Sequence, residues 1–179
     1  MRYYMFALFV SLCACSIPIK ESREAKIVKE LTGKELVFNN NLFADAAKDD
    51  QSSRDVFQQK TSKIVTIVNY DCGPCRESIK KWKEYFNGKN IPFILIVRGG
   101  DEEFYNDIRS KESSSFRYIY YDMNNMFELT NKIPQDIRLR TFLINRENKI
   151  RIIGNPLFNK DIAKLYDEEI ISANAPATR

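Results

Sequence analysis

The sequence predicts an α/β fold in which helices flank a central mixed sheet and an N-terminal extension precedes the domain. Two observations predict it. Apolar, β-branched runs alternate with segments whose apolar residues recur every three or four positions, a pattern typical of parallel strands joined by crossover helices. Two more apolar runs near the C-terminus flank the polar link "RENK", which predicts an antiparallel hairpin. A chain of 179 residues that is 44% hydrophobic is long enough to build one core of this kind.

The N-terminal extension has the pattern of a lipoprotein signal. Arg2 precedes the apolar run "YYMFALFVSLCA", which is shorter than the roughly 20 residues that span a bilayer. The run leads into "LCAC", which resembles the bacterial lipobox, and the resemblance implies that Cys15 becomes the lipid-modified first residue of the mature chain. The alternative is a plain secretory signal in which Cys13 and Cys15 are incidental. The predicted divisions are a signal peptide (1–14), a tether (15–24), the folded domain (25–172) and a flexible tail (173–179).

The chain ahead of the sheet is predicted to be mostly irregular. Residues 25–38 predict a short helix that ends near Gly33, followed by a short strand. Residues 39–62 are rich in Asn, Asp, Gln and Ser, which predicts a long loop with at most a helical turn.

The regular elements then follow in the order βαβαβα, a hairpin and a last helix. β-Branched apolar residues predict the first strand, while Ile79, Trp82 and Phe86 predict a helix that Gly88 ends. By the same criteria the strands are predicted at 63–70, 91–97, 116–122, 140–145 and 149–154, and the helices at 75–88, 100–113, 123–133 and 159–172.

Between the first strand and its helix lies the motif Cys72-Gly73-Pro74-Cys75. A structural zinc site needs four ligands, and the chain has no histidine and no other thiol beyond the signal region. Haem attachment needs a histidine after the second cysteine, where this chain has Arg76. A structural disulfide of this spacing closes a very small loop and adds little stability. An inert C-x-x-C and a dithiol–disulfide redox pair remain.

The position of the motif favours the redox pair. Cys72 precedes a helix, where unpaired N–H groups and the positive end of the helix dipole stabilise a thiolate. Cys75 lies three residues further on, close enough for a disulfide. Gly73 helps the bend into the helix, and Pro74 costs no hydrogen bond in the first turn. The Cys72–Cys75 disulfide is therefore predicted to be the functional group, without a separate cofactor or metal.

A CGPC between a buried strand and a helix resembles the thioredoxin superfamily. The likeness covers roughly residues 60–170, and "RTFLINRENKIRIIGNP" is similar to the closing strand pair of TlpA-like, membrane-tethered members. The resemblance implies a thioredoxin-like fold with Cys72 as the exposed attacking thiol and Cys75 as the more buried resolving thiol. It also implies that Gly73 and Pro74 tune the couple and that Tyr70 and Asp71 flank it. The Asp71 carboxylate is expected to raise the pKa of Cys72.

Two positions depart from the family pattern. The family has a cis-proline before the closing strand pair, where this chain has Leu139 or Arg140, so we expect trans peptide bonds there. Arg140 is expected either near the disulfide, where it stabilises a thiolate, or in solvent as an ordinary loop arginine. Thr66 replaces the buried acid of thioredoxins, so proton transfer has to use water, Glu77 or another side chain.

The resemblance implies a thiol–disulfide oxidoreductase that is lipid-anchored and faces the periplasm in the cell envelope of a Gram-negative bacterium. Its expected partners are protein disulfide substrates of the envelope and an upstream membrane thiol reductant, and CGPC indicates reducing character. The alternatives are a redox-inactive thioredoxin-like binding module and a thiol peroxidase, whose Thr-x-x-Cys motif the CGPC does not match. The net charge of +4, carried by scattered lysines, makes a nucleic-acid partner unexpected.

Overall fold

The computed structural model describes residues 21–38, 55–99, 118–122 and 124–174, together with residues 106, 110 and 116. The predicted signal peptide, its lipobox with Cys15 and most of the predicted loop lie outside these residues. The helix predicted at 100–113 also lies outside them, apart from two helical residues, 106 and 110. None of the helices in the described ranges has the length and apolar character needed to cross a membrane.

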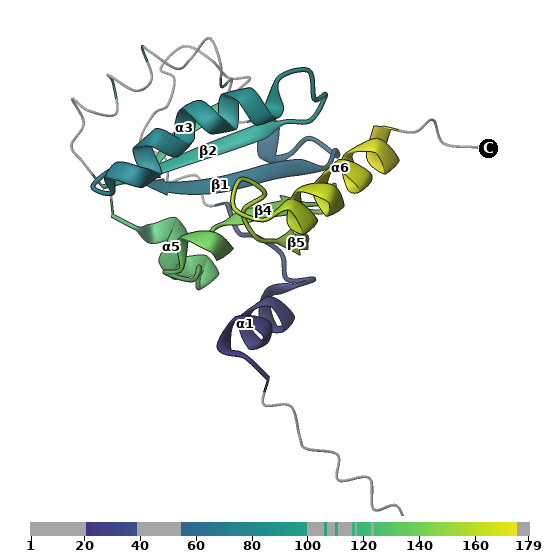
Figure 1. Ribbon diagram of the computed structural model, residues 1–179, viewed down its shortest axis with the longest axis horizontal. Helices are drawn as coiled ribbons and strands as arrows, with labels where there is room; N and C mark the ends of the chain where they lie inside the picture. The colour runs from purple at the N-terminus through teal and green to yellow at the C-terminus, as the bar shows by residue number, and fades with distance from the viewer. Residues whose placement is uncertain are drawn as a thin grey trace, which may run out of the picture.

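Five strands form one mixed sheet in the order β3-β2-β1-β4-β5 (Figure 1). β1, β2 and β3 are parallel, β4 is antiparallel to β1, and β5 is antiparallel to β4. The mixed sheet and its closing hairpin are therefore confirmed. The strands are β1 (Lys63–Asn69), β2 (Phe93–Arg98), β3 (Tyr118–Asp122), β4 (Thr141–Ile144) and β5 (Ile150–Ile153).

Apart from η2, which the sequence did not predict, the described helices match the predicted positions with small shifts at their ends. They are α1 (Arg23–Leu31), η1 (Asp55–Phe57), α3 (Gly73–Phe86), α5 (Met126–Asn131), η2 (Ile137–Leu139) and α6 (Lys160–Asn174). Ser22 caps α1, so the helix already begins within the predicted tether, and α6 extends into the predicted tail. The short strand expected after Gly33 is reduced to a single bridge between Glu35 and Lys149.

Helices cover both faces of the sheet (Figure 1). On one face, α3 and α6 bury Trp82 and Tyr166 against the strands. On the other face, α1, η1 and α5 contribute Leu31, Val56 and Phe127 to a second apolar cluster. Each central strand thus alternates its side chains between two apolar layers, which is why these strands have continuous apolar sequences.

The cysteine motif and the buried Lys63 lie at opposite ends of β1. The CGPC motif follows the carboxyl end of β1 and opens α3. At the opposite end of β1, the buried ammonium of Lys63 donates to Gln59 O at 2.6 Å, Thr61 O at 3.0 Å and Asn148 Oδ1 at 3.2 Å. Burial lowers the pKa of Lys63 to about 8. Lys63 therefore ties the segment before β1 to the β4–β5 turn, far along the strand from the cysteines.

Candidate active site

Cys72 is the N-cap residue of α3, as the sequence predicted. Its backbone is extended, with φ −98° and ψ 108°, and its carbonyl oxygen accepts the N–H of Cys75 at 3.0 Å and of Arg76 at 3.1 Å. Its Sγ accepts the N–H of Cys75 at 3.3 Å. This sulfur therefore lies where the first free N–H groups of a 14-residue helix point, which is an environment that stabilises a negative charge.

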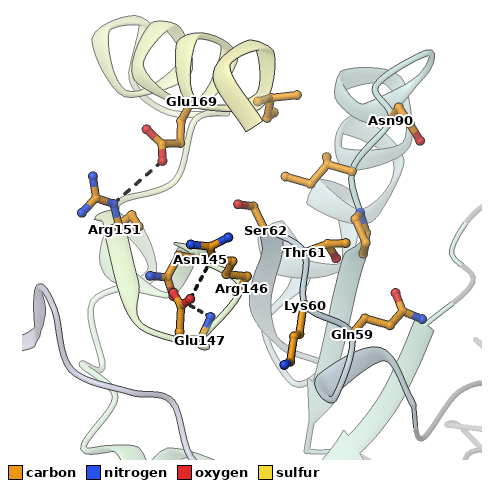
Figure 2. A pocket seen from close by; sticks show the side chains of 13 residues that line it. Gln59, Lys60, Thr61, Ser62, Asn90, Asn145, Arg146, Glu147, Arg151 and Glu169 are labelled. Carbon is orange, nitrogen blue, oxygen red and sulfur yellow. Dashed lines mark hydrogen bonds and ion pairs between the residues drawn. The ribbon is translucent and has the colours of Figure 1, made fainter. Parts of the chain in front are cut away.

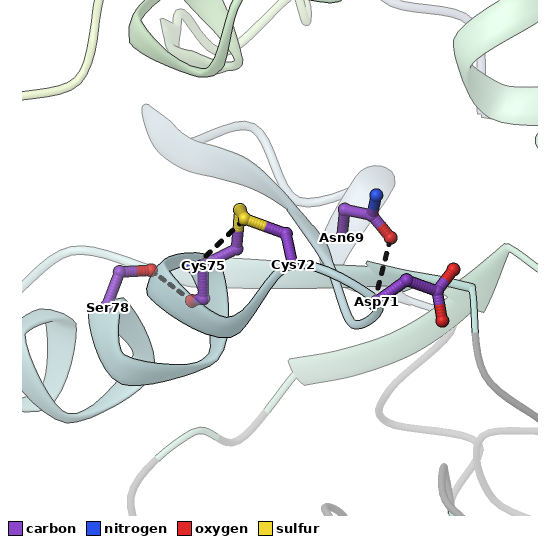
Figure 3. Close-up of a disulfide and its surroundings, with 5 residues drawn as sticks. All are labelled: Asn69, Asp71, Cys72, Cys75 and Ser78. Carbon is purple, nitrogen blue, oxygen red and sulfur yellow. Dashed lines mark hydrogen bonds between the residues drawn. A yellow bond between two sulfur atoms is a disulfide. The ribbon is translucent and has the colours of Figure 1, made fainter.

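Cys72 and Cys75 form a disulfide (Figure 3). Their Cα atoms are 5.2 Å apart, within the range of ordinary disulfides. Cys72 is half-buried, whereas Cys75 is only 8% exposed and packs into the cluster that includes Ile79 and Trp82. The two sulfurs therefore differ in access: a visiting disulfide can reach Cys72 first.

Cys75 also lines a small hollow of about 20 Å³ beneath the disulfide. We call it the active-site hollow. Its lining includes Pro74, Thr66, Ser78, Trp82 and Arg140, and Ile137, Asn155 and Phe158 lie around it as well. The hollow joins the carboxyl end of β1, the first turns of α3 and the chain on either side of the β4–β5 hairpin. Residues from four parts of the sequence, Cys75 among them, thus line the same hollow.

Tyr70 and Asp71 directly precede the cysteine motif, as the sequence predicted. The ring of Tyr70 packs against the core, and the Arg76 guanidinium lies 4.7 Å from its centroid. Asp71 is exposed, and Figure 3 shows its carboxylate directed away from the disulfide. The Asp71 carboxylate therefore does not face the Cys72 sulfur.

Gly73 and Pro74 open α3. Pro74 stands in the first turn, where its missing N–H costs no hydrogen bond. A Cβ at Gly73 would meet no atom within 4 Å, and its φ lies outside the left-handed region. The bend into the helix therefore does not require glycine at this position.

Gly99, which the sequence did not single out, shapes the approach to Cys72. Its φ is +75°, and a Cβ there would lie 2.9 Å from Asn69 Oδ1 and would also press on the Asp71 carboxylate. Asn69 Oδ1 accepts the N–H of Asp71 at 3.1 Å, so the same contact stabilises the turn that ends at Cys72.

Gly99→Ala is expected to destabilise the fold more than Gly88→Ala. Gly88 has nearly the same φ, +77°, but nothing within 4 Å of its Cβ position, so both variants carry the left-handed strain of about 1–2 kcal/mol and only Gly99→Ala adds the clash. Urea unfolding of both variants measures the difference. Equal losses of unfolding free energy in the two variants would contradict the contact of Gly99 with the turn.

The position of the thioredoxin buried acid holds a hydroxyl pair. Thr66 is buried in β1, and its Oγ1 lies 2.8 Å from Oγ1 of Thr141 in β4, so the two hydroxyls satisfy each other. Glu77, one of the expected alternatives for proton transfer, is exposed on the surface of α3. Neither residue therefore supplies a buried carboxyl beside Cys75.

Arg140 is buried, so its interpretation as a solvated loop arginine is wrong. Its side chain is 3% exposed and forms an ion pair with Glu128 of α5. Its carbonyl oxygen accepts the N–H of Ile67 at 3.0 Å, which fixes the residue beside β1. The described residues contain no cis peptide bond, as expected for this loop. Burial and the neighbouring Arg98 lower the pKa of Arg140 to about 10, so the guanidinium remains charged at neutral pH.

The sequence reasoning missed Glu128, Thr141 and Ser78. Ser78 Oγ donates to Cys75 O at 2.5 Å, and its spacing of three from Cys75 on a helix could have shown this contact. Glu128 gave no comparable signal, because a lone glutamate in a short helix is usually solvated.

A larger groove of about 640 Å³ lies at the other end of the sheet (Figure 2). Four of its charged side chains form ion pairs, Arg151 with Glu169 and Arg146 with Glu147. Its lining residues are drawn from the chain before β1 and β2, the β4–β5 turn and the end of α6. Neither cysteine of the motif lines this groove, which is therefore separate from the disulfide. Within the described ranges, no three Cys, Asp or Glu side chains gather as potential metal ligands.

Comparison with known proteins finds similarity at the level of structure. No family model matches the chain, and no curated protein matches it. The reduced form of the N-terminal domain of PilB from N. meningitidis aligns over 68% of this chain and 88% of that chain, with a TM-score of 0.50 and 14% identity.

Two further structures give similar values. The exposed lipoprotein thioredoxin of Streptococcus pneumoniae covers 62% of this chain and 86% of its own, with a TM-score of 0.48 and 13% identity. A secreted Mycobacterium tuberculosis disulfide oxidoreductase homologous to E. coli DsbE covers 64% and 83%, with a TM-score of 0.47 and 11% identity. The sheet order and the alignment with the PilB domain show that this chain has the thioredoxin-like fold that its sequence predicted.

Proposed function

We propose that the chain is a thiol–disulfide oxidoreductase that exchanges disulfides with protein substrates through Cys72 and Cys75. One observation carries this proposal: the accessible Cys72 caps α3, its sulfur accepts a backbone N–H of that helix, and it is bonded to the less accessible Cys75. An inert C-x-x-C needs no such division between an accessible sulfur and a buried one. We assign supporting roles around this pair to Tyr70, Asp71, Gly73 and Pro74, which adjoin it in sequence, and to Arg140, which lines the active-site hollow.

The reaction consists of two exchanges. The reduced chain enters with Cys72 as thiolate and Cys75 as thiol, and the Cys72 sulfur attacks a substrate disulfide. A Cys72–substrate bond forms, the substrate disulfide breaks, and one substrate thiolate departs. Cys75 then gives its proton to that departing thiolate and attacks Cys72 Sγ, which forms the Cys72–Cys75 disulfide and releases the second substrate sulfur as thiolate. Two electrons pass from the chain to the substrate.

Net reduction of substrates requires a thiol donor that reduces the Cys72–Cys75 disulfide again. CGPC indicates a reducing couple, near the thioredoxin value of about −270 mV and far from the DsbA value of about −120 mV. We assign the donor role to a membrane thiol reductant and the substrate role to disulfide-bonded proteins of the cell envelope. The sequence "LCAC" supports lipid anchoring at Cys15, which holds the domain at the periplasmic face of a Gram-negative membrane.

Insulin reduction tests the proposed function. With dithiothreitol as the electron source, the wild-type chain is expected to accelerate insulin reduction above the rate with dithiothreitol alone. No acceleration by a correctly folded, reduced chain would support the alternative of a redox-inactive binding module. Rapid consumption of hydrogen peroxide without insulin reduction would instead support a thiol peroxidase.

A further inference from the structure

Four charged side chains gather around the end of the sheet that carries the cysteines. They come from the ends of β2 and β3, from α5 and from the residue before β4: Arg98, Asp122, Glu128 and Arg140. Asp122, Glu128 and Arg140 are buried, and the Arg98 side chain is 19% exposed. Buried charges are costly unless they are paired, so this arrangement is unusual enough to need a reason.

Glu128 is the centre of this charged group. Its Oε2 accepts Arg98 Nη1 at 2.8 Å, and its Oε1 pairs with Arg140 Nη2. Asp122 accepts the N–H groups of Met126 at 2.7 Å and Phe127 at 3.0 Å, so its carboxylate caps α5 and holds Glu128 in place. Burial raises the pKa of Asp122, and the hydrogen bonds from the N–H groups of Met126 and Phe127 oppose that rise. Glu128 thereby fixes the position of the Arg140 guanidinium.

Arg140 is the member of this group that lines the active-site hollow together with Cys75. Its Nη2 pairs with Glu128, and its Nε has no hydrogen-bond partner among the residues that the structure describes. The hollow is small, about 20 Å³, and Arg140 is the charged residue among those that line it. Arg140 thus borders the hollow that Cys75 lines, whereas its partner Glu128 and Asp122 are not among the residues that line it.

The other polar groups of the hollow are neutral and already engaged. Thr66 pairs with Thr141, Ser78 donates to Cys75 O, and Asn155 Oδ1 accepts the N–H of Leu157 at 2.9 Å. Charged groups on the neighbouring surfaces of α3 and of the loop before β4 are exposed or half-exposed: Asp71, Arg76, Glu77, Asp136 and Arg138. A surface charge is screened by water, whereas a buried one acts at lower dielectric.

We propose that Arg140 stabilises the Cys75 thiolate during the second exchange and that Glu128 is the positioning residue that holds the guanidinium and offsets part of its charge. The inference rests on the proposed function and names what assists its second step. There, Cys75 loses its proton to the departing substrate thiolate, and the guanidinium keeps its own proton throughout. The proposed assistance is electrostatic: Arg140 stabilises the Cys75 thiolate but does not accept its proton.

Substitutions of Arg140 and Glu128 are expected to change the rate of attack by Cys75 in opposite directions. Arg140→Met removes the positive charge and is expected to slow attack by Cys75. Glu128→Gln removes the compensating negative charge, keeps the shape of the side chain, and is expected to speed attack by Cys75. Arg140→Lys retains the charge and is expected to stay within about twofold of the wild-type rate. A purely structural role of the ion pair predicts losses in both partners and no such change of sign.

The experiment follows the reaction of the reduced chain with 5,5′-dithiobis(2-nitrobenzoate), on a background in which Cys13 and Cys15 are serine. The first thionitrobenzoate released reports attack by Cys72, and the second reports the intramolecular attack by Cys75. The second rate is expected to fall roughly fivefold in Arg140→Met and to rise by a similar factor in Glu128→Gln. The fraction of Cys75 present as thiolate changes by more than this, but a more readily formed thiolate is also a weaker nucleophile, which offsets part of the change. The pH midpoint of the Cys75 step is expected to rise in Arg140→Met and to fall in Glu128→Gln. The rate of attack by Cys72 is expected to stay nearly constant in both variants.

Lys63→Met is the matched control, because Lys63 is another buried cation, placed at the opposite end of β1. It is expected to leave both rates unchanged. If Glu128→Gln does not fold, Arg140→Met and Arg140→Lys still test the charge, and their equal second rates would overturn the proposal. Shifts of the same sign in Arg140→Met and Glu128→Gln would also overturn it. The second release is measurable whether or not insulin is a substrate, so failure of this inference and failure of the proposed function are distinguished.

Discussion

Replacing Cys72 with serine is expected to lower insulin reduction to the rate of dithiothreitol alone. The serine hydroxyl cannot form a disulfide with the substrate, and Cys75 is only 8% exposed, so no second sulfur can take over the first attack. The measurement is the turbidity assay for insulin reduction, with wild-type chain and Cys72→Ser side by side.

Loss of the disulfide has to be separated from loss of the fold. The Cys72–Cys75 bridge spans a sequence separation of three, and short loops give less stabilisation than the roughly 3 kcal/mol of a 15-residue loop. Circular dichroism of Cys72→Ser is therefore expected to match that of the wild type at room temperature. Wild-type activity in a folded Cys72→Ser would end the enzymatic interpretation.

Trp82→Ala is expected to cost about 3–5 kcal/mol of unfolding free energy, a large share of the 5–15 kcal/mol typical of a domain. Trp82 is fully buried under α3, with its ring centroid 5.5 Å from that of Phe86 and 5.4 Å from that of Phe93. Its removal opens a cavity between α3 and the sheet that adjoins the active-site hollow, which Trp82 lines. Urea unfolding followed by circular dichroism measures the loss, since Trp82 is the only tryptophan in the chain.

Ile171→Ala is the control for this prediction. Ile171 lies on α6 with 71% of its side chain exposed, so truncation is expected to change stability by no more than about 0.5 kcal/mol. A Trp82→Ala variant as stable as Ile171→Ala would contradict the packing of α3 on the sheet.

The fold was predictable because burial leaves a direct pattern in the sequence. β1 and β2 are covered on both faces, so their residues are continuously apolar, and Trp82 and Ile79 mark the buried side of α3. The place of Cys72 at the start of α3 was predictable for a similar reason: the strand, the CGPC and the helical period follow one another without a gap. Local sequence determines both features.

The surroundings of the cysteines were less predictable because tertiary contacts determine them. Arg140 and Glu128 are each charged residues in short segments, and only the packing of α5 against the end of the sheet buries both. The Asp71 carboxylate lies in space that a side chain at Gly99, just after β2, would occupy. Thr66 could be recognised as the replacement of the buried acid, but its partner Thr141 comes from the antiparallel β4. Pairing across strands fixes these contacts, and no sequence spacing encodes them.

Trapping of the mixed disulfide tests the central claim most directly. Reduced Cys75→Ser, mixed with insulin, is expected to form a covalent adduct through Cys72 that dithiothreitol dissolves, because the resolving sulfur is missing. The wild type is expected to show no lasting adduct, and the double variant Cys72→Ser with Cys75→Ser serves as the control for the other thiols. Mass spectrometry identifies the joined peptides. No adduct in Cys75→Ser, or an equal amount in the double variant, would contradict the assignment of Cys72 as the attacking sulfur.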